Sequence, residues 1–327
     1  MTHVVSPDPS TVVDAPPRRE HVHGAFATRF QVDRSRADGI RVVQGAMYRN
    51  DGSLIDLSVR VSGVMGDHVH TADPPTVRIE RAEVLRGRGL YLGNVYSHYG
   101  HFITEGLGTL WPVARGERFD YFAAHPFIFA NTQPDFLVQA FRRLGIDIDR
   151  VHVLRRPTLF DDIVVPERAW QASVSVNLAF RDVVDRIRRH GEGDLKVYLS
   201  RDRIAKRPIA NEIDVATAFE RRGFTVVRPE ELSFAEQLEL YARASVIAGF
   251  AGSQLHNLLF ARSGTVVISI GDGLRRPLMP NQVLCNAIRE STAIVVDFKG
   301  SGNTFDLDAL DGELWAAASV TPPVTAR

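Results

Sequence analysis

The sequence has almost no cysteine, since Cys285 is the only one in 327 residues. A disulfide within the chain is therefore impossible, and this usage is typical of proteins from a reducing, cytoplasmic compartment. The chain also lacks an excess of either charge: Lys and Arg together number 39, and Asp and Glu together number 39. Without a net field, neither nucleic acid nor an anionic membrane is favoured as a partner.

Long apolar runs are missing as well. No stretch of 18 apolar residues occurs, so no membrane-spanning helix is expected. The first 38 residues hold no apolar run of signal-peptide length and are rich in Pro, Asp and Arg. This composition predicts a poorly ordered tail over residues 1–38. A metal site formed by His3, His21 and His23 is the alternative to a solvated tail, which is the favoured interpretation.

From about residue 75, short apolar runs alternate with stretches of helical spacing. The alternation predicts βαβ units and a mainly parallel sheet, hence an α/β fold. In the first half, strands are expected over residues 77–80, 89–95, 126–130, 151–154 and 162–166. Helices are expected over residues 101–114 and 134–145, with Pro134 in the first turn of the second one.

The second half of the chain repeats the pattern more regularly. Its expected strands cover residues 196–200, 224–227, 245–249, 265–271 and 293–298, and its expected helices cover 211–223, 233–244, 253–261 and 281–290. Asn211 and Gly223 are typical ends of the first of these helices. Ser233 and Glu236 form a capping-box pattern at the second. The order of elements predicts a doubly wound sheet.

A break between two domains is expected near the middle of the chain. A long helix expected over residues 174–189 leads into the sequence GEGD. The expected parts are a tail (1–38), an N-terminal α/β domain (39–170), a connecting helix (171–194), a C-terminal Rossmann-like domain (195–300), and a C-terminal helix with a loose tail (301–327).

The turn GFAGS joins the strand expected at 245–249 to the next helix. Gly249 and Gly252 permit positive φ and close approach of a ligand. Ser253 is a suitable N-cap, and the first N–H groups of a helix favour an anion such as a diphosphate. His256 would lie near the same place. A glycine turn is also common as plain structure, and a lone histidine is often only partly buried, so both interpretations stay open.

A basic cluster follows the strand expected at 196–200. Arginine forms bidentate bonds with phosphate oxygens, and the end of a parallel strand would direct Arg201 toward the ligand crevice. A solvated basic loop is the alternative. Lys206 and Arg207, which lie further from the strand, are expected at the surface.

A third cluster, SHYGHFITE, contains His98, His101 and Glu105 at a spacing that places them on one face of a helix. The three side chains could bind a metal, His101 or Glu105 could act as a general base, or the two could simply pair. The HExxH zinc pattern is absent.

Together these motifs resemble one known family. YGHFITE followed by LW, then YLSR, then NE, then GFTVVRPEELSFAEQ, then ASVIAGFAGSQLHNLLFARSGTVV resemble the glycosyltransferase family 61 catalytic domain over residues 90–272. The resemblance is closest to bacterial members linked with capsular or other surface polysaccharide synthesis. It implies a GT-B architecture, in which two Rossmann-like domains face each other across a cleft. It also implies inverting transfer from a nucleotide sugar, with no cofactor or metal required.

The resemblance also implies roles for individual residues. Arg201 would hold the diphosphate. From the residues of the third cluster, Glu105 is preferred over His101 as the base that deprotonates the acceptor. The remaining implied substrate-binding residues are His98, Arg203, Glu230, Glu236, Gln237, Gly252, Ser253, His256 and Asn257. Glu236 keeps its alternative role in the capping box. The chain departs from the family at Gln254, where many relatives have a small residue.

The expected function is therefore transfer of a sugar from a nucleotide-diphosphate sugar, with UDP as the default nucleotide, to a glycan or other hydroxyl acceptor. A catalytically silent nucleotide- or glycan-binding protein of the same fold is the alternative. Another kind of Rossmann enzyme is disfavoured, because no GxGxxG follows a first strand. A lipid-linked acceptor would bring the protein to a membrane surface, and the sequence does not determine the oligomeric state.

Overall fold

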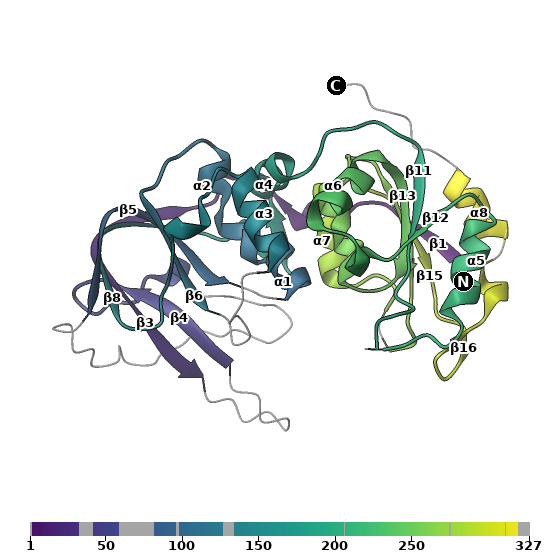
Figure 1. The fold of residues 1–327 in the computed structure, drawn as a ribbon, viewed down its shortest axis with the longest axis horizontal. Coiled ribbons are helices and arrows are strands. Elements are labelled where there is room, and N and C mark those ends of the chain that lie inside the picture. Colours follow the sequence, from purple (N-terminus) through teal and green to yellow (C-terminus); the bar gives the residue numbers. More distant parts are fainter. Residues whose placement is uncertain are drawn as a thin grey trace. The chain divides into compact units, whose positions relative to one another are not determined.

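The computed structural model describes residues 2–32, 42–58, 82–95, 98–126, 134–205, 207–274, 276–310 and 312–319. The chain divides into two compact units, which are considered separately here. One unit contains residues 13–186, and the other contains residues 1–12 and 187–327. Each has its own six-stranded sheet with helices packed on it (Figure 1), so the predicted α/β class is confirmed.

The sheet of the unit containing residues 187–327 is mostly parallel. Its strands, in spatial order, are β1 (Thr2–Val5), β15 (Ala293–Val296), β14 (Val266–Ile270), β13 (Ala244–Phe250), β11 (Leu195–Leu199) and β12 (Thr225–Val227). Only β1 runs antiparallel, beside β15, and the other neighbours are parallel. Numbered along the chain, the parallel strands follow the doubly wound order 2-1-3-4-5, and the order reverses between β11 and β13.

Helices cover both faces of this sheet. Helices α5 (Glu212–Glu220) and α8 (Gly312–Ser319) lie on one face, and α6 (Phe234–Arg243) and α7 (Pro280–Ile288) lie on the other (Figure 1). Every residue of β13 and β14 is buried, as expected for parallel strands covered on both faces. On the α5 side, Phe219 stacks on Tyr198 with ring centroids 4.7 Å apart. A short antiparallel ribbon, β16 (Gly300–Ser301) and β17 (Thr304–Phe305), precedes α8.

The poorly ordered tail expected over residues 1–38 is wrong for residues 2–32. Strand β1 pairs with β15 from Thr2↔Val296 to Val5↔Ala293, and β3 (Arg19–Val32) pairs with β8. At the start of β3, exposed polar residues surround the buried Val22, whereas Ala25, Phe26 and Ala27 are all buried. The polar start lowers the mean hydropathy of the segment, although the strand is part of the sheet. Residues 33–38 lie outside the described residues.

The sheet of the unit formed by residues 13–186 is mixed. Its strands, in spatial order, are β4 (Val42–Tyr48), β3, β8 (Thr158–Pro166), β5 (Glu83–Val95), β6 (Tyr121–Pro126) and β7 (Val151–Val153). Strands β8, β5, β6 and β7 are parallel, whereas β3 runs antiparallel to both β4 and β8. Read from β7, the parallel strands have the Rossmann order 3-2-1-4, so this sheet reverses its order between β5 and β8.

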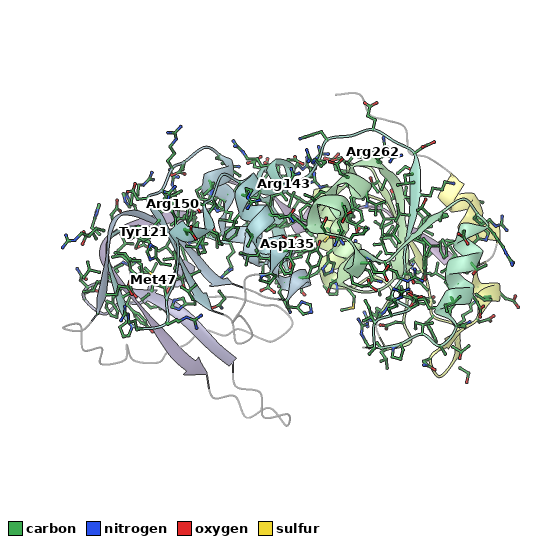
Figure 2. The ribbon with its side chains drawn as sticks, viewed as in Figure 1. Met47, Tyr121, Asp135, Arg143, Arg150 and Arg262 are labelled. Atoms are coloured by element: carbon green, nitrogen blue, oxygen red, sulfur yellow. The ribbon has the colours of Figure 1, made fainter. Side chains whose placement is uncertain are left out.

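Apolar side chains fill the interior around this sheet. Tyr121 and Met47, labelled in Figure 2, belong to one buried cluster together with Phe160 and Ile163. Helix α3 (Asp135–Arg143), whose end residues Figure 2 also labels, agrees with the helix expected from residue 134. Pro134 is its N-cap rather than part of its first turn.

Two expected helices of this unit differ from the structure. The helix expected over 101–114 is divided into α1 (Tyr99–Thr104), the 3-10 helix η4 (Gly106–Thr109) and α2 (Trp111–Ala114). Glycines in η4 lower helix propensity, and a proline removes an N–H donor, which explains the interruptions.

The helix expected over 174–189 is shortened to α4 (Ala179–Ile187). Residues Ser175–Asn177 instead form β10, which pairs with β9 (Trp170–Gln171) across a turn in which Ser173 adopts φ 63°. Strand β2 (Val12–Val13) lies in the chain between β1 and β3. The strands expected at 77–80 and 127–130 lie outside the described residues, and β6 begins at Tyr121, before the expected position.

Candidate active site

The carboxyl ends of three parallel strands meet at one edge of the sheet that contains β11. Ser200 and Arg201 follow β11, Gly252 follows β13, and Asp272 follows β14. Strands β11 and β13 are in register from Val197↔Ile247 to Leu199↔Gly249, so their loops leave side by side. The strand order reverses between these two strands, and open α/β sheets bind ligands at such a point. The structure thus brings together Arg201 and the glycine turn, as predicted.

Arg201 is buried at this edge, with 3% of its side chain exposed. Its Nη1 lies 4.0 Å from Oδ2 of Asp272, whose side chain is 0% exposed. Its backbone N–H donates to Oε1 of Glu212 at 2.5 Å. A buried guanidinium with a carboxylate partner is held in one position, which is the condition for binding an anion without reorganisation.

Arg207 also belongs to this cluster, although the sequence interpretation placed it at the surface. Its guanidinium forms an ion pair with Asp272, and only 20% of its side chain is exposed. A Cβ added to Gly252 would lie 3.8 Å from Nη2 of Arg207, so this guanidinium reaches the glycine turn. Arg207 has φ 58° and precedes Pro208, a combination that is sterically unfavourable for a non-glycine residue. Lys206 lies outside the described residues.

Asp272 connects the two arginines. Its carboxylate faces both guanidinium groups, and its Oδ1 accepts a hydrogen bond from Leu274 N at 3.2 Å. The sequence interpretation missed this residue, although an aspartate directly after an expected strand in GDG was a usable signal. Because Asp272 is buried, it keeps the two positive charges close together, against their mutual repulsion.

Glu212, the first residue of α5, is the second residue that the sequence interpretation missed. It is 2% exposed and accepts hydrogen bonds from Arg201 N and from Ser200 Oγ, the latter at 3.4 Å. Burial raises the pKa of the Glu212 carboxyl to about 7, although the hydrogen bond from Arg201 acts in the opposite direction. The Glu212 carboxyl, which accepts a hydrogen bond from the backbone of Arg201, therefore changes its charge near neutral pH.

The basic residues further along this loop face other partners. Arg203 is 65% exposed and forms an ion pair with Glu231. Asp202 accepts two hydrogen bonds from Arg228, each 2.7 Å long, and these hold the pKa of Asp202 below its usual value. The structure therefore separates Arg203 from the buried pair formed by Arg201 and Arg207.

The glycine turn differs in detail from its expected form. Gly252 has φ 174°, an extended value that any residue adopts, and Gly249 is not among the residues with positive φ. These glycines supply room instead, because a Cβ on Gly249 would lie 3.1 Å from the carbonyl oxygen of Leu199. Gly252, not Ser253, is the N-cap of the following helix, which is the 3-10 helix η7 (Ser253–Phe260). Gln254 donates to the carbonyl of Phe250 at 3.2 Å.

Other predicted donor-site residues have structural contacts. Asn257 is buried and donates to Oη of Tyr241 at 3.0 Å, which fastens η7 to α6. His256 lies on η7, half-buried. Glu236 completes the predicted capping box, accepting from Ser233 N at 2.8 Å.

Gln237 donates to the carbonyl oxygens of Pro229 and Leu232. Glu230 is exposed in the 3-10 helix η6 (Pro229–Glu231). Beside η6 and α6, the surface has a hollow of about 550 Å³, whose lining includes Glu236.

The second cluster follows the carboxyl end of β5 in the unit of residues 13–186. His98 is the N-cap residue of α1, and Nδ1 of His101 lies 2.7 Å from Oε1 of Glu105. The exposed fraction is 46% for the His101 side chain and 2% for that of Glu105. The ring of His98 lies 5.2 Å from that of His101. The sheet order reverses between β5 and β8, so this cluster also follows a strand at a reversal point.

Arg168, which follows β8, lies beside this second cluster, and the sequence interpretation missed it. It is 9% exposed, and its Nη1 donates to the backbone carbonyl of Glu105 at 3.4 Å. Gly93 has φ 70°, and a Cβ there would collide with the guanidinium of Arg168. The glycine in β5 therefore makes room for a buried cation next to the pair formed by His101 and Glu105.

The paired imidazole and carboxylate have the geometry of an acid–base pair. A buried carboxylate within hydrogen-bond distance of Nδ1 holds the half-exposed imidazole in one orientation, and such a contact favours the tautomer whose Nε2 can accept a proton. Within the described part of the chain, His98, His101 and Glu105 do not form a three-ligand group.

Comparison with known families adds a decisive observation. The family model for glycosyltransferase 61 matches residues 99–268, just over half of the chain. The chain belongs to glycosyltransferase family 61. The match begins with α1, covers His101 and Glu105 of one cluster and Arg201 and Arg207 of the other, and ends inside β14, before Asp272. Family membership indicates a glycosyltransferase, with a sugar donor and an acceptor as substrates.

A search of curated proteins gave no match. In the part of the chain that the structure describes, no helix has the length and apolar character needed to cross a membrane.

Proposed function

We propose that the protein is an inverting glycosyltransferase of GT-B type that uses a nucleoside-diphosphate sugar. UDP is the proposed nucleotide, and a glycan hydroxyl in bacterial surface polysaccharide synthesis is the proposed acceptor. The observation that carries the proposal is the buried group formed by Arg201, Arg207 and Asp272 at the reversal point of a doubly wound sheet. The single cysteine supports a cytoplasmic location.

The donor diphosphate would bind at this group. The guanidinium groups of Arg201 and Arg207 supply planar donors for phosphate oxygens, and Gly252 leaves room for the phosphates beside them. The N–H groups of Ser253 and the next residues of η7 add partial positive charge. His256 would face the sugar, and Glu230, beside the hollow at α6, would face the nucleoside. We leave Glu236 and Asn257 in their structural contacts.

The chemical step would be a single displacement at the anomeric carbon. The acceptor hydroxyl attacks, the bond to the diphosphate breaks, and the acceptor proton passes to a base. Arg201 and Arg207 would stabilise the negative charge that develops on the departing diphosphate, because they are already in position and shielded from water. Two guanidinium groups that are already in position do not have to reorganise during the reaction.

We propose His101 as the base and Glu105 as its positioning partner. The sequence favoured Glu105, but this carboxylate is 2% exposed and already accepts from His101, whereas half of the imidazole is exposed. Nε2 of His101 would take the proton, and Glu105 would stabilise the resulting imidazolium. His98 and Arg168 would help to bind the acceptor or the donor beside this pair.

The donor site is tested by calorimetric binding of UDP, GDP, CDP and dTDP to the wild type and to Arg201→Ala. We expect one diphosphate to bind, with affinity reduced by roughly tenfold or more in the variant, since a hydrogen bond to a charged group contributes about 1.5–3 kcal/mol. Arg203→Ala is the matched control and should bind as the wild type does. If a folded wild type binds none of the four, the proposed donor site is wrong.

The alternative of a catalytically silent binding protein predicts the same binding but no turnover. Hydrolysis or transfer of the sugar from the nucleotide sugar that matches the bound diphosphate distinguishes the two. Turnover in the wild type that is lost in His101→Ala, with diphosphate binding retained, supports the enzyme. Absence of turnover with every acceptor class supports the silent protein.

A further inference from the structure

Two histidines and an aspartate meet on the sheet of the unit formed by residues 13–186, away from the clusters described above. His21 and His23 are alternate residues of β3, so their side chains lie on the same face of the strand. Strand β8 runs beside β3 with His23 directly opposite Asp162. The alternative metal interpretation of the sequence also included His3, but His3 lies in β1, opposite Val295.

The three side chains offer nitrogen and oxygen atoms within reach of one ion. One ring nitrogen or carboxylate oxygen from each residue lies within 4.8 Å of the others. Nε2 of His21 contacts Oδ1 of Asp162, and Nδ1 of His23 lies 3.8 Å from the same oxygen. In a tetrahedral zinc site with bonds of about 2.0–2.2 Å, the ligand atoms are about 3.3 Å apart. Small side-chain rotations are therefore enough to form such a site.

The backbone beneath this cluster is fixed. The hydroxyl of Tyr121, labelled in Figure 2, donates to the backbone carbonyl of Asp162 at 3.1 Å. Antiparallel pairing with β3 continues on both sides, from Arg19↔Pro166 to Ala27↔Thr158. The ligands are thus carried by two rigid strands rather than by a loop, which lowers the entropy cost of assembling a site.

The cluster is remote from the candidate base. Asp162 is in register with Arg88 of β5, and β5 continues to Val95 before the motif that contains His101 begins. At about 3.3 Å per residue, this separation is about 23 Å along the strand. An ion bound here would therefore stabilise the pairing of β3 with β8 and would not take part in sugar transfer.

We propose that His21, His23 and Asp162 form a structural binding site for a divalent transition-metal ion, with Zn²⁺ as the preferred probe. Imidazole nitrogen and carboxylate oxygen suit Zn²⁺, Ni²⁺ and Cu²⁺, whereas Mg²⁺ and Ca²⁺ prefer oxygen ligands alone. Three protein ligands leave a fourth position for water. The ion would connect β3 to β8, which is one of the four parallel strands of the sheet.

The test is calorimetric titration of the tag-free, chelator-treated full chain with ZnCl₂, followed by thermal unfolding with and without the metal. We expect one Zn²⁺ per chain and a higher melting temperature, because an ion that binds only the folded state stabilises it. MgCl₂ should give neither effect. Substitution with Co²⁺ should produce the visible absorption bands of a coordinated ion.

Three variants and two controls make the result decisive. His21→Ala, His23→Ala and Asp162→Asn should each weaken Zn²⁺ binding by about tenfold or more, since each removes a ligand. The His21 and His23 side chains are 47% and 75% exposed, so these substitutions leave the core intact. Asp161→Asn and His190→Ala are matched controls and should bind Zn²⁺ like the wild type. Zn²⁺ binding that is unchanged when all three ligands are replaced, or that is weak and occupies many sites, overturns the proposal.

Discussion

At the scale of single residues, Asp272 holds together the charges of the proposed donor site. Two guanidinium groups repel each other, and a carboxylate with a fully buried side chain beside both of them offsets this repulsion. Arg207 adopts its unfavourable φ of 58° before Pro208, and a strained backbone that persists at a cluster of charges suggests a functional constraint. Arg201 was recognisable from its position after a strand, but Arg207 was not, because the loop returns to the site only in three dimensions.

Replacing Arg207 tests its assignment to the donor site. Arg207→Ala should reduce the affinity for the bound nucleoside diphosphate by about tenfold or more, comparable to Arg201→Ala, because each removes a charged donor from the phosphates. Calorimetry with the diphosphate measures this effect. Arg203→Ala is the control, since its guanidinium pairs with Glu231 at the surface. If Arg207→Ala and Arg203→Ala bind the diphosphate with equal affinity, Arg207 does not belong to the donor site.

Glu212 should make stability depend on pH. Its folded pKa of about 7 lies above the usual value of 4.5 for a glutamate, so the folded protein binds the proton more tightly than the unfolded chain does. The contribution is fully present below pH 4.5 and is lost as the pH rises to and beyond 7. Glu212→Gln keeps an acceptor for Arg201 N and removes the titration.

Urea unfolding of the wild type and Glu212→Gln at several pH values measures this effect. Between pH 4.5 and pH 8, the unfolding free energy of the variant should rise relative to that of the wild type by roughly 3 kcal/mol, from 1.36 kcal/mol per pKa unit. Parallel pH profiles of the two proteins would show that the carboxyl titrates normally in the folded state.

At the scale of elements, pairing with a distant strand makes a weakly apolar segment such as β1 a strand. The capping box of Ser233 and Glu236 is local and follows from four consecutive residues, so the sequence predicted it and the structure confirms it. Strand β1 has only four residues and its partner lies nearly three hundred residues later, in β15. The local composition of residues 1–38 therefore favoured a disordered tail, whereas in the structure β15 at the edge of the sheet is the partner of β1.

Removal of β1 tests its part in the fold. Deleting residues 1–8 leaves β15 as an edge strand that is paired only with β14. The deletion removes the hydrogen bonds between β1 and β15, each worth about 1 kcal/mol net, so the loss should be roughly 2–4 kcal/mol. Urea unfolding of the deleted and complete chains measures the difference. His3→Ala keeps the backbone pairing and serves as the control. An unchanged unfolding free energy after the deletion would mean that β1 contributes nothing to stability.

At the scale of the whole molecule, each unit carries one of the two clusters to which a role is proposed. The unit of residues 13–186 carries His101 and Glu105, and the unit of residues 1–12 and 187–327 carries Arg201, Arg207 and Asp272. Each cluster follows a strand at the reversal point of its own sheet. The proposed division of labour assigns proton transfer to the first unit and donor binding to the second.

Kinetics of the base variants test this division. His101→Ala should lower kcat by roughly 10²–10⁴, the usual contribution of a general base, while diphosphate affinity stays that of the wild type. Glu105→Gln should lower kcat less, because the imidazole remains and only its orientation is lost. Steady-state rates with the matching nucleotide sugar and calorimetry with its diphosphate separate the two effects. Full turnover of His101→Ala would exclude His101 as the base.

The sequence alone determined the α/β class, most strands of the sheet that contains β11 to β15, the capping box and the family resemblance. All of these depend on short-range periodicity or on motifs of adjacent residues. Tertiary structure decided which polar groups meet. Asp272 and Arg207 lie 65 residues apart, and Arg168 reaches Glu105 across 63 residues. Such pairs form because the ends of parallel strands converge at one edge of a sheet, and no local pattern records which loop returns to that edge.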